Sequence, residues 1–284
     1  MVTVLESIKL STSYFEKKGI ESPRVNAEIL LAHVLKCKRL DLYMAFDKPL
    51  KEKELATYRE TIKRRATFEP LQYIVGSVEF YGLPFQVDRS VLIPRPETEI
   101  LVESIINAFP KDNCFNILDI GTGTGNIPIS LAKYLPQSHF TSIDISRDAL
   151  KLAKQNAADN SVSDRIVFLH KDILSTETEF ENKFDIIVSN PPYVPVNEYP
   201  TLQAEIIRFE PREAVTDEND GLTFYKSISG KAELLLNENG YLFFEVGKGQ
   251  AGCVYEIMEA DNYKNIKIIK DYLNIERVIC GVKS

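Results

Sequence analysis

The segment Asn190-Pro191-Pro192-Tyr193 combines residue types that can bind a planar amino group. Two consecutive prolines fix φ and carry no N–H, so the carbonyls around them stay available as hydrogen-bond acceptors. Asn190 adds a side-chain acceptor, and Tyr193 adds a flat ring on which a planar group can stack. A turn that only ends a strand needs neither of these side chains. The motif therefore indicates a rigid set of acceptors for a substrate that carries an NH2 group.

A glycine-rich segment, Gly121-Thr122-Gly123-Thr124-Gly125, follows an apolar run and precedes a helical pattern. Glycine lets the backbone turn sharply and approach a ligand with no Cβ in the way. The GxGxxG spacing of dinucleotide-binding enzymes is missed, because position 126 is Asn. The segment therefore favours a nucleoside ligand other than a nicotinamide dinucleotide.

Two acidic residues follow other apolar runs of the same region. Asp144 stands 19 residues after Gly125, at the end of the next run. An acid about 20 residues beyond the glycines, at the carboxyl end of a strand, is placed to accept hydrogen bonds from ribose hydroxyls. Asp172 follows the third run and is predicted to accept from an adenine amino group, although a solvated loop acid would look the same in sequence.

These candidate residues need elements that bring them together, and from position 97 onward the chain alternates two kinds of segment. Short runs rich in Ile, Val and Phe predict buried strands at residues 114–120, 140–145, 166–170, 184–189 and 241–246. Helical patterns surround them at residues 97–109, 126–135, 147–160, 222–236 and 250–261. Alternating βα units predict a parallel sheet with helices on both faces, and ligands bind at the carboxyl ends of the strands in such sheets.

The two ends of the chain have different patterns. Residues 1–75 are predicted to be helical, with Ser22 as an N-cap before Pro23 and a second helix at 51–65. Short β-type runs at 77–81 and 84–87 predict a hairpin within a linker at residues 76–95. The last two runs, 266–273 and 277–282, are separated by three residues, too few for a crossover, so an antiparallel strand is expected there. Residues 96–284 then form the larger domain.

Composition and charge exclude several classes of protein. With 44% hydrophobic and 26% charged residues over 284 positions, the chain is neither disordered nor fibrous. Its net charge of −7 argues against binding nucleic acid through bulk charge. The charge is uneven, at +4 up to Gly76 and −11 from Ser77 onward, which suggests that the two parts meet different partners. No apolar run is long enough to cross a membrane and no signal peptide is recognisable, so we expect a cytoplasmic protein.

Cysteine and histidine do not form the spacings of a metal site. The four cysteines, Cys37, Cys114, Cys253 and Cys280, lie far apart, and no CxxC pair occurs. We expect buried thiols and no bound metal.

Several motifs together resemble a known family. The glycine segment combined with Asn190-Pro191-Pro192-Tyr193 is similar to S-adenosylmethionine-dependent amino-methyltransferases. More narrowly, three further segments resemble the release-factor glutamine methyltransferases, also called PrmC or HemK. These are Glu69-Pro70-Leu71-Gln72-Tyr73-Ile74-Val75-Gly76, Leu92-Ile93-Pro94-Arg95-Pro96-Glu97-Thr98-Glu99 and Phe209-Glu210-Pro211-Arg212-Glu213-Ala214. The resemblance covers almost the whole chain.

This resemblance implies the α/β fold of class I S-adenosylmethionine-dependent methyltransferases. Expected are a Rossmann-like, seven-stranded, mostly parallel sheet with one antiparallel strand, a small all-α N-terminal domain that recognises the substrate, and a β-hairpin linker. The cofactor would be S-adenosylmethionine, with S-adenosylhomocysteine as product, held by Gly121, Thr122, Gly123, Thr124, Gly125, Asp144, Asp172, Ile173 and Asn190. Where other members can carry an aromatic residue beside the adenine, this chain has Ile173, so apolar packing would replace stacking.

The implied substrate is the glutamine of the Gly-Gly-Gln motif in class I peptide chain release factors, which act in translation termination. We expect a monomer. Our hypothesis for the catalytic residues, Asn190, Pro191, Pro192 and Tyr193, is that the Asn190 oxygen and the Pro191 carbonyl each accept one N–H of the substrate amide while Tyr193 stacks on its plane. Glu97 and Thr98 either line the methionine end of the cofactor or cap a helix. Residues 210–213 either close over the substrate or form a loop ion pair.

Two rival functions stay open from the sequence. An adenine-N6 DNA or RNA methyltransferase would use the same Asn-Pro-Pro-Tyr tetrapeptide on a flipped base, but it would need a basic groove beside the site. A catalytically silent methyltransferase-like binding module would have no need of Asn190 and Tyr193.

Overall fold

The computed structural model describes residues 2–176 and 178–284. Its internal contacts divide the chain into two compact units. One unit comprises the described residues up to Ser77 together with Gln203–Phe209, and the other comprises Val78–Leu202 and Glu210–Ser284. Nothing in the sequence pattern predicts that residues 203–209 belong with the N-terminal residues.

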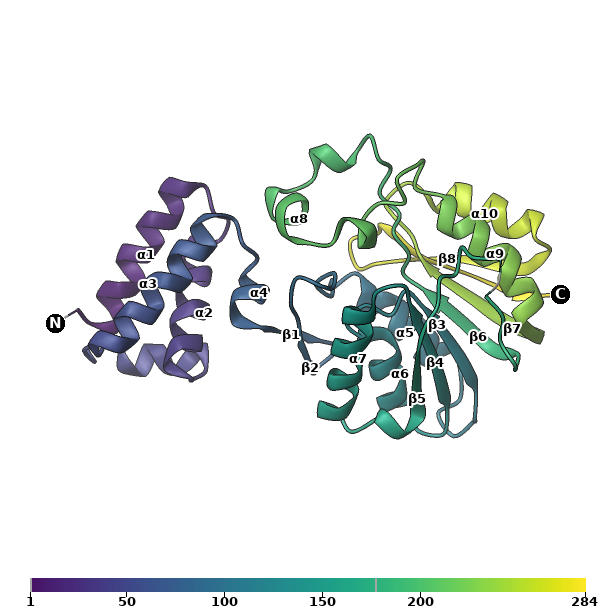
Figure 1. Ribbon diagram of the computed structural model, residues 1–284, viewed down its shortest axis with the longest axis horizontal. Helices are drawn as coiled ribbons and strands as arrows, with labels where there is room; N and C mark the ends of the chain where they lie inside the picture. Colours follow the sequence, from purple (N-terminus) through teal and green to yellow (C-terminus); the bar gives the residue numbers. More distant parts are fainter. Residues whose placement is uncertain (1, 177) are drawn as a thin grey trace. The chain divides into compact units, whose positions relative to one another are not determined.

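The smaller unit is helical (Figure 1). Its elements are α1 (Val4–Lys18), α2 (Pro23–Leu35), a 3₁₀ helix (Arg39–Ala45), α3 (Glu52–Ala66), α4 (Leu71–Val75) and the short α8 (Ala204–Phe209). The helices expected after Pro23 and at residues 51–65 are confirmed as α2 and α3, and Leu30, Tyr58 and Ile62 on them lie in the apolar core of the unit. The Tyr58 hydroxyl donates to the Ala27 carbonyl at 3.0 Å and so ties α3 to α2.

The start of α2 differs from the predicted cap. The helix begins at Pro23 as expected, but Ser22 has a left-handed backbone with φ of 47° and its side chain makes no capping hydrogen bond. Instead, the Asn26 side chain donates back to the carbonyls of Glu21 and Ser22. A backbone already turned into the left-handed region cannot direct the Ser hydroxyl at the first free N–H groups, which a cap requires.

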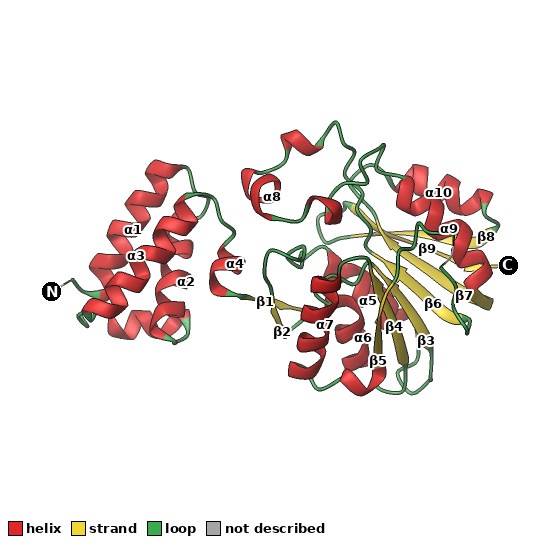
Figure 2. Cartoon of the chain, in the orientation of Figure 1, coloured by secondary structure: helices red, strands yellow, loops and turns green. Residues whose placement is uncertain are grey.

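A seven-stranded sheet forms the centre of the larger unit (Figure 2). The strands are β3 (Asn116–Ile120), β4 (His139–Asp144), β5 (Ile166–His170), β6 (Phe184–Ser189), β7 (Leu236–Glu245), β8 (Tyr263–Lys270) and β9 (Glu276–Lys283). Their order is β5-β4-β3-β6-β7-β9-β8, and β9 runs antiparallel to both of its neighbours. The predicted parallel sheet with an antiparallel strand at the end of the chain is therefore confirmed.

Helices cover both faces of this sheet. They are α5 (Thr98–Ala108), α6 (Asn126–Tyr134), α7 (Arg147–Asp159), α9 (Thr223–Leu235) and α10 (Ala251–Ala260). One buried apolar cluster joins α5, α6 and α7 to the sheet, and another joins α9 and α10 to it. Alternating strands and crossover helices place the carboxyl ends of β3, β4, β5 and β6 at the same edge, where the candidate residues follow.

The predicted hairpin is present as β1 (Ser77–Phe80) and β2 (Leu83–Gln86). Phe80 and Phe85 are buried in the core of the larger unit, with their rings edge to face. The side chain of Asn156 on α7 holds β2, because it accepts from the Gln86 N–H at 2.7 Å and donates to the Gln86 carbonyl. The hairpin thus packs as part of the sheet unit.

The expectation of buried thiols is correct only for Cys280. Cys114 and Cys253 are exposed and Cys37 is half-buried, because Cys37 and Cys114 lie outside the helices and strands and Cys253 lies on an exposed side of α10. No trio of His, Cys, Asp or Glu within residues 2–176 and 178–284 is arranged to hold a metal ion. None of the helices in those ranges has the length and apolar character needed to cross a membrane.

Candidate active site

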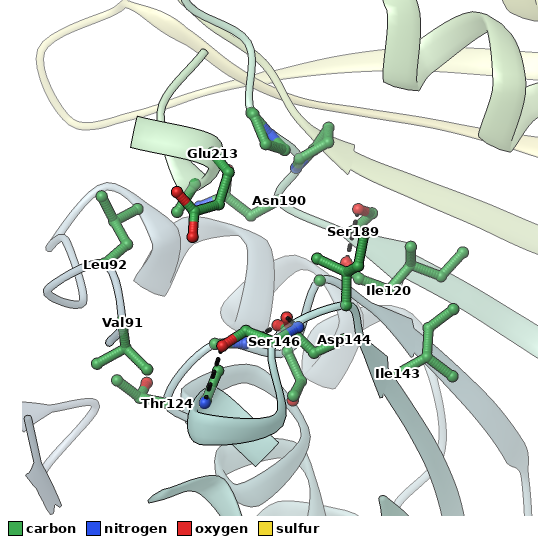
Figure 3. Close-up of a pocket in the computed structure, with 18 of the residues that line it drawn as sticks. Val91, Leu92, Ile120, Thr124, Ile143, Asp144, Ser146, Ser189, Asn190 and Glu213 are labelled. Carbon is green, nitrogen blue, oxygen red and sulfur yellow. Dashed lines mark hydrogen bonds between the residues drawn. The ribbon is translucent and has the colours of Figure 1, made fainter. Parts of the chain in front are cut away.

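A cavity lies in the larger unit at the carboxyl ends of β3 to β6 (Figure 3). Most of the residues singled out in the sequence line it. These are Gly121, Thr122, Gly123, Thr124, Asp144, Asp172, Ile173, Asn190, Pro191 and Pro192. Gly125 and Tyr193 are not part of the lining. The structure thus brings four separate motifs to one cavity, as parallel strands with a common edge require.

The glycine segment forms a tight turn between β3 and α6. Gly121, Gly123 and Gly125 all have positive φ, at 77°, 52° and 79°. A Cβ on Gly121 or Gly123 would meet nothing within 4 Å, so their backbone is open to a ligand. A Cβ on Gly125 would lie 2.8 Å from Ile129 Cδ1, so this glycine serves the packing of α6 instead.

Asp144 ends β4 and lies against the glycine turn. Its Oδ2 accepts from the Gly123 N–H at 2.9 Å, and its Oδ1 accepts from the Ser146 N–H at 2.8 Å (Figure 3). Burial raises the pKa of this carboxyl, and the backbone donors around it act in the opposite direction. Each oxygen keeps a second lone pair, so Asp144 can accept from a diol while the backbone fixes its orientation.

Asp119, at the carboxyl side of β3, is a residue that the sequence analysis missed. It is 0% exposed, and burial raises the pKa of its carboxyl to about 7. The hydroxyls of Thr122 and Ser142 lower this pKa, while the charge of Asp144 raises it further. The available signal was an acid between apolar residues of the predicted strand, two positions before the first glycine. Asp119 therefore places a second carboxyl beneath the turn.

Asp172 and Ile173 follow β5 and line the cavity together. Asp172 Oδ1 accepts from the Leu174 N–H at 2.8 Å, which holds the side chain in a tight local turn. Ile173 is buried in the apolar cluster under α9, and the ammonium of Lys231 donates to its carbonyl. An apolar surface beside an acceptor is what one face and one edge of a purine need.

Asn190 and the two prolines follow β6 directly. The Asn190 Nδ2 donates to Thr98 Oγ1 at 3.2 Å. In the part of the chain that the structure describes, neither Asn190 Oδ1 nor the Pro191 carbonyl has a hydrogen-bond partner. Two acceptors thus stand next to each other on a backbone that proline makes rigid.

Tyr193 lies beside this cavity, with its ring against the apolar cluster under α9 and α10. Its hydroxyl donates to Glu245 Oε1 at 3.4 Å, and its carbonyl accepts from Gln250 Nε2 at 2.8 Å. Burial raises the pKa of this phenol well above its ordinary value, so it stays protonated. The ring is half-buried, and its predicted stacking on a substrate stays a prediction.

The two segments left open in the sequence have distinct arrangements. Thr98 lines the cavity and holds Asn190, whereas Glu97 makes no side-chain cap and is outside the lining. Arg95, which lines the cavity, meets the buried Glu210 carboxylate through Nη2 at 2.6 Å, so an ion pair ties the second segment to the wall of the cavity. Pro211 and Glu213 of the same segment also line the cavity.

Two family models match the chain. One, described as the PrmC N-terminal domain, matches residues 6–76, and the other, described as a methyltransferase domain, matches residues 111–279. A release factor glutamine methyltransferase from Fusobacterium nucleatum subsp. nucleatum is 41% identical over 99% of this chain and 79% of its own length. Another with that name, from Chlorobaculum tepidum, is 40% identical over 97% of this chain and 95% of its own.

The chain belongs to the release factor glutamine methyltransferase family.

Solved structures agree with this placement at the level of the fold. A methyltransferase from Pyrococcus furiosus has a TM-score of 0.55 at 19% identity, covering 78% of this chain and 98% of its own. The catalytic domain of hMettl16, solved in complex with a 3′UTR hairpin, also has a TM-score of 0.55, at 18% identity and 82% coverage of both chains. At such identities the likeness establishes the methyltransferase fold and nothing about substrate. The predicted class I methyltransferase fold is thereby confirmed, with the helical N-terminal domain of the release factor glutamine methyltransferases.

Proposed function

We propose that this chain transfers a methyl group from S-adenosylmethionine to the side-chain amide nitrogen of the glutamine in the Gly-Gly-Gln motif of class I peptide chain release factors. Relatives named release factor glutamine methyltransferase match this chain over nearly their full length, which supports the assignment. We further propose that it works in the cytoplasm as a monomer and leaves S-adenosylhomocysteine as product.

The residues around the cavity fit this cofactor. Open space at Gly121 and Gly123 lets a ligand approach the turn closely, and Asp144 offers fixed acceptors for ribose hydroxyls. Asp172 and Ile173 offer an acceptor and an apolar surface for the adenine. When bound there, the cofactor supplies an electrophilic methyl group on a sulfonium.

The protein has to make a poor nucleophile react. An amide nitrogen has its lone pair delocalised into the carbonyl, and positive charge develops on it as a fourth bond forms. The Asn190 oxygen and the Pro191 carbonyl would accept its two N–H groups, so this charge meets acceptors already in place. Holding the nitrogen there also removes the entropy cost of finding the reactive geometry. No strong base is needed, since the proton is acidified once the bond has formed.

The single observation that carries the proposal is the hydrogen bonding of the Asn190 side chain. Its nitrogen is engaged by Thr98 while its oxygen, next to the Pro191 carbonyl, has no partner among the described residues. A pair of acceptors recognises a group with two N–H donors, which a glutamine amide has.

The test offers the purified chain labelled S-adenosylmethionine together with a class I release factor or with duplex DNA. We expect label on the release factor, and none on a variant factor whose Gly-Gly-Gln glutamine is replaced by alanine. Label on the DNA alone would support the adenine-N6 alternative. Binding of the cofactor without transfer to any substrate would support a silent binding module.

A further inference from the structure

A buried carboxyl behind the acceptor site has no role in the proposed methyl transfer. Glu245 is the last residue of β7 and is 1% exposed. Since β7 lies next to β6 in the sheet, this carboxyl comes close to the residues that follow β6, although it is 52 positions from Tyr193 in sequence. Burying a carboxyl is costly, and no cation meets it within ion-pair distance among the described residues.

Glu245 is linked to both side chains of the acceptor motif. It contacts Tyr193 directly and is linked to Asn190 through Thr98. Its Oε1 accepts from the Tyr193 hydroxyl at 3.4 Å. The other carboxylate oxygen of Glu245, Oε2, is buried and has no hydrogen-bond partner among the described residues, and the Thr98 hydroxyl is close enough to lower the pKa of this carboxyl. Thr98 is 1% exposed, and its Oγ1 also accepts from Asn190 Nδ2 at 3.2 Å.

The chemistry of a hydroxyl gives this chain of contacts a direction. A threonine hydroxyl has one hydrogen to donate and lone pairs to accept with. An ionised Glu245 only accepts, and its Oε2 is free to take the hydrogen of the Thr98 hydroxyl beside it. The Thr98 oxygen can then only accept from the side-chain amide of Asn190, so Asn190 must direct its NH2 group toward Thr98. The Asn190 oxygen therefore points away from Thr98.

Resting on the proposed function, we propose that Thr98 and Glu245 are positioning residues that fix the Asn190 amide with its oxygen toward the substrate and hold Tyr193 through its hydroxyl. Neither residue touches the reacting atoms in this role. If the amide were reversed, it would present N–H donors to a substrate that itself has only N–H groups to offer at that point. The correct orientation is therefore required for an acceptor site.

Several charged and titratable groups face Glu245 from the elements packed around it. Glu97 precedes α5, Arg277 lies on β9, and Tyr193 follows β6. Tyr225 of α9 donates to the Glu245 backbone carbonyl at 2.9 Å. Burial and the charge of Glu97 raise the pKa of Glu245 to about 7, while Arg277 and the two hydroxyls oppose the rise. A protonated Glu245 would donate to Thr98 and release the constraint on Asn190, so we expect kcat to fall as the pH drops below about 7.

The experiment compares Thr98→Val with Thr98→Ser in the full chain. Valine keeps the shape of threonine and removes the hydroxyl, whereas serine keeps the hydroxyl. With cofactor and release factor saturating, we expect Thr98→Val to lower kcat roughly 10- to 100-fold, the usual loss when a supporting contact behind a site is removed. KM for the release factor and the affinity for S-adenosylhomocysteine should change less than about twofold, and Thr98→Ser should recover most of the rate.

Glu245→Gln provides a second variant should Thr98→Val fail to fold. Its kcat should be low and should no longer depend on pH between 6 and 8, because the group that titrates there has been removed. A readout without turnover is the NMR signal of the Asn190 side-chain NH2, assigned by its disappearance in Asn190→Asp. This signal should shift in Thr98→Val and stay in place in Thr98→Ser.

The outcomes separate this inference from the proposed function. A parent chain that methylates release factor, with Thr98→Val and Glu245→Gln equally fast and an unmoved Asn190 signal, would overturn the inference and leave the function intact. A parent chain that does not methylate release factor would refute the function. In that case the NMR signal alone still decides whether Thr98 orients Asn190.

Discussion

The side chains of this site are held by the protein at one end and left for a ligand at the other. Asp144 accepts backbone N–H groups from Gly123 and Ser146, and both of its oxygens can still accept more. Asn190 gives its nitrogen to Thr98 and keeps its oxygen. Such half-satisfied groups lose little freedom when a ligand binds, because their orientation is already fixed. Substitutions that keep the size of a side chain but change its donors should therefore be as harmful as truncations.

Asp144 allows a direct test of this idea. Asp144→Asn would place an NH2 group against one of two backbone N–H donors, so we expect it to weaken S-adenosylhomocysteine binding at least about tenfold, as Asp144→Ala should. Calorimetric titration measures the affinity, and Asp148→Asn, an exposed position on α7 outside the cavity, is the control. An Asp144→Ala protein that binds like its parent would show that the ribose does not lie here.

Asp119 makes stability depend on pH. Its folded pKa of about 7 lies above the ordinary value of 3.8, so the folded state holds a proton that the unfolded state has lost between these values. Stability is thus complete at low pH and falls as the pH rises through this window, by roughly 4 kcal/mol at most. We expect Asp119→Asn to gain stability over the parent chain as the pH rises from 4 to 8, measured by urea unfolding. A difference between the two proteins that stays constant with pH would contradict the assignment.

The glycine turn depends on elements that are distant in sequence. Asn156 on α7 donates to the Thr124 carbonyl at 2.9 Å and also bonds both backbone groups of Gln86 on β2. The hairpin, α7 and the turn are therefore joined through one buried amide. Within the turn, Gly123 faces open space while Gly125 faces α6 and α7.

This difference predicts that alanine at Gly125 mainly lowers stability, whereas alanine at Gly123 mainly lowers ligand binding. Gly125→Ala combines an unfavourable positive φ with overpacking against Ile129, so we expect a loss of roughly 2–5 kcal/mol of stability. Gly123→Ala should cost only about 1–2 kcal/mol, but its Cβ would occupy ligand space and abolish S-adenosylhomocysteine binding. Thermal unfolding with and without ligand measures both effects. Equal stability of the two variants would contradict the packing role of Gly125.

Elements with strong local patterns were predictable from the sequence, and contacts between distant strands were not. The strands at residues 166–170 and 184–189 end where expected, and the motifs that follow the strands line one cavity, although the roles of these residues stay predictions. Glu245 escaped notice because its position depends on β7 lying beside β6. The α8 segment escaped notice because a helix of six residues is too short to show a helical period in the sequence.

At the scale of the whole molecule, the candidate cofactor cavity lies in one unit and the positive net charge in the other. All residues that line the candidate cavity belong to the larger unit. The helical unit has no cofactor motif, yet the residues up to Gly76 have a net charge of +4 against −11 for the rest. We therefore interpret the helical unit as the part that recognises the protein substrate.

Removal of the helical residues should accordingly separate binding from turnover. We expect a fragment of residues 77–284 to bind S-adenosylhomocysteine like the full chain and to methylate release factor poorly. The contribution of the helical unit should weaken with salt, because exposed charges are screened within about 8 Å at physiological ionic strength. Initial rates at low substrate and two salt concentrations measure this. Full activity of the fragment would reduce the helical unit to a stabilising element.

The measurement that tests the central claim most directly is the turnover of Asn190→Ala with cofactor and release factor both saturating. In our account the Asn190 oxygen accepts an N–H of the substrate amide as charge develops on nitrogen. Removing a fixed partner of that kind lowers kcat on the order of 10²–10³-fold, while S-adenosylhomocysteine binding stays close to that of the parent chain. A variant that turns over as fast as the parent under these conditions would contradict the acceptor mechanism.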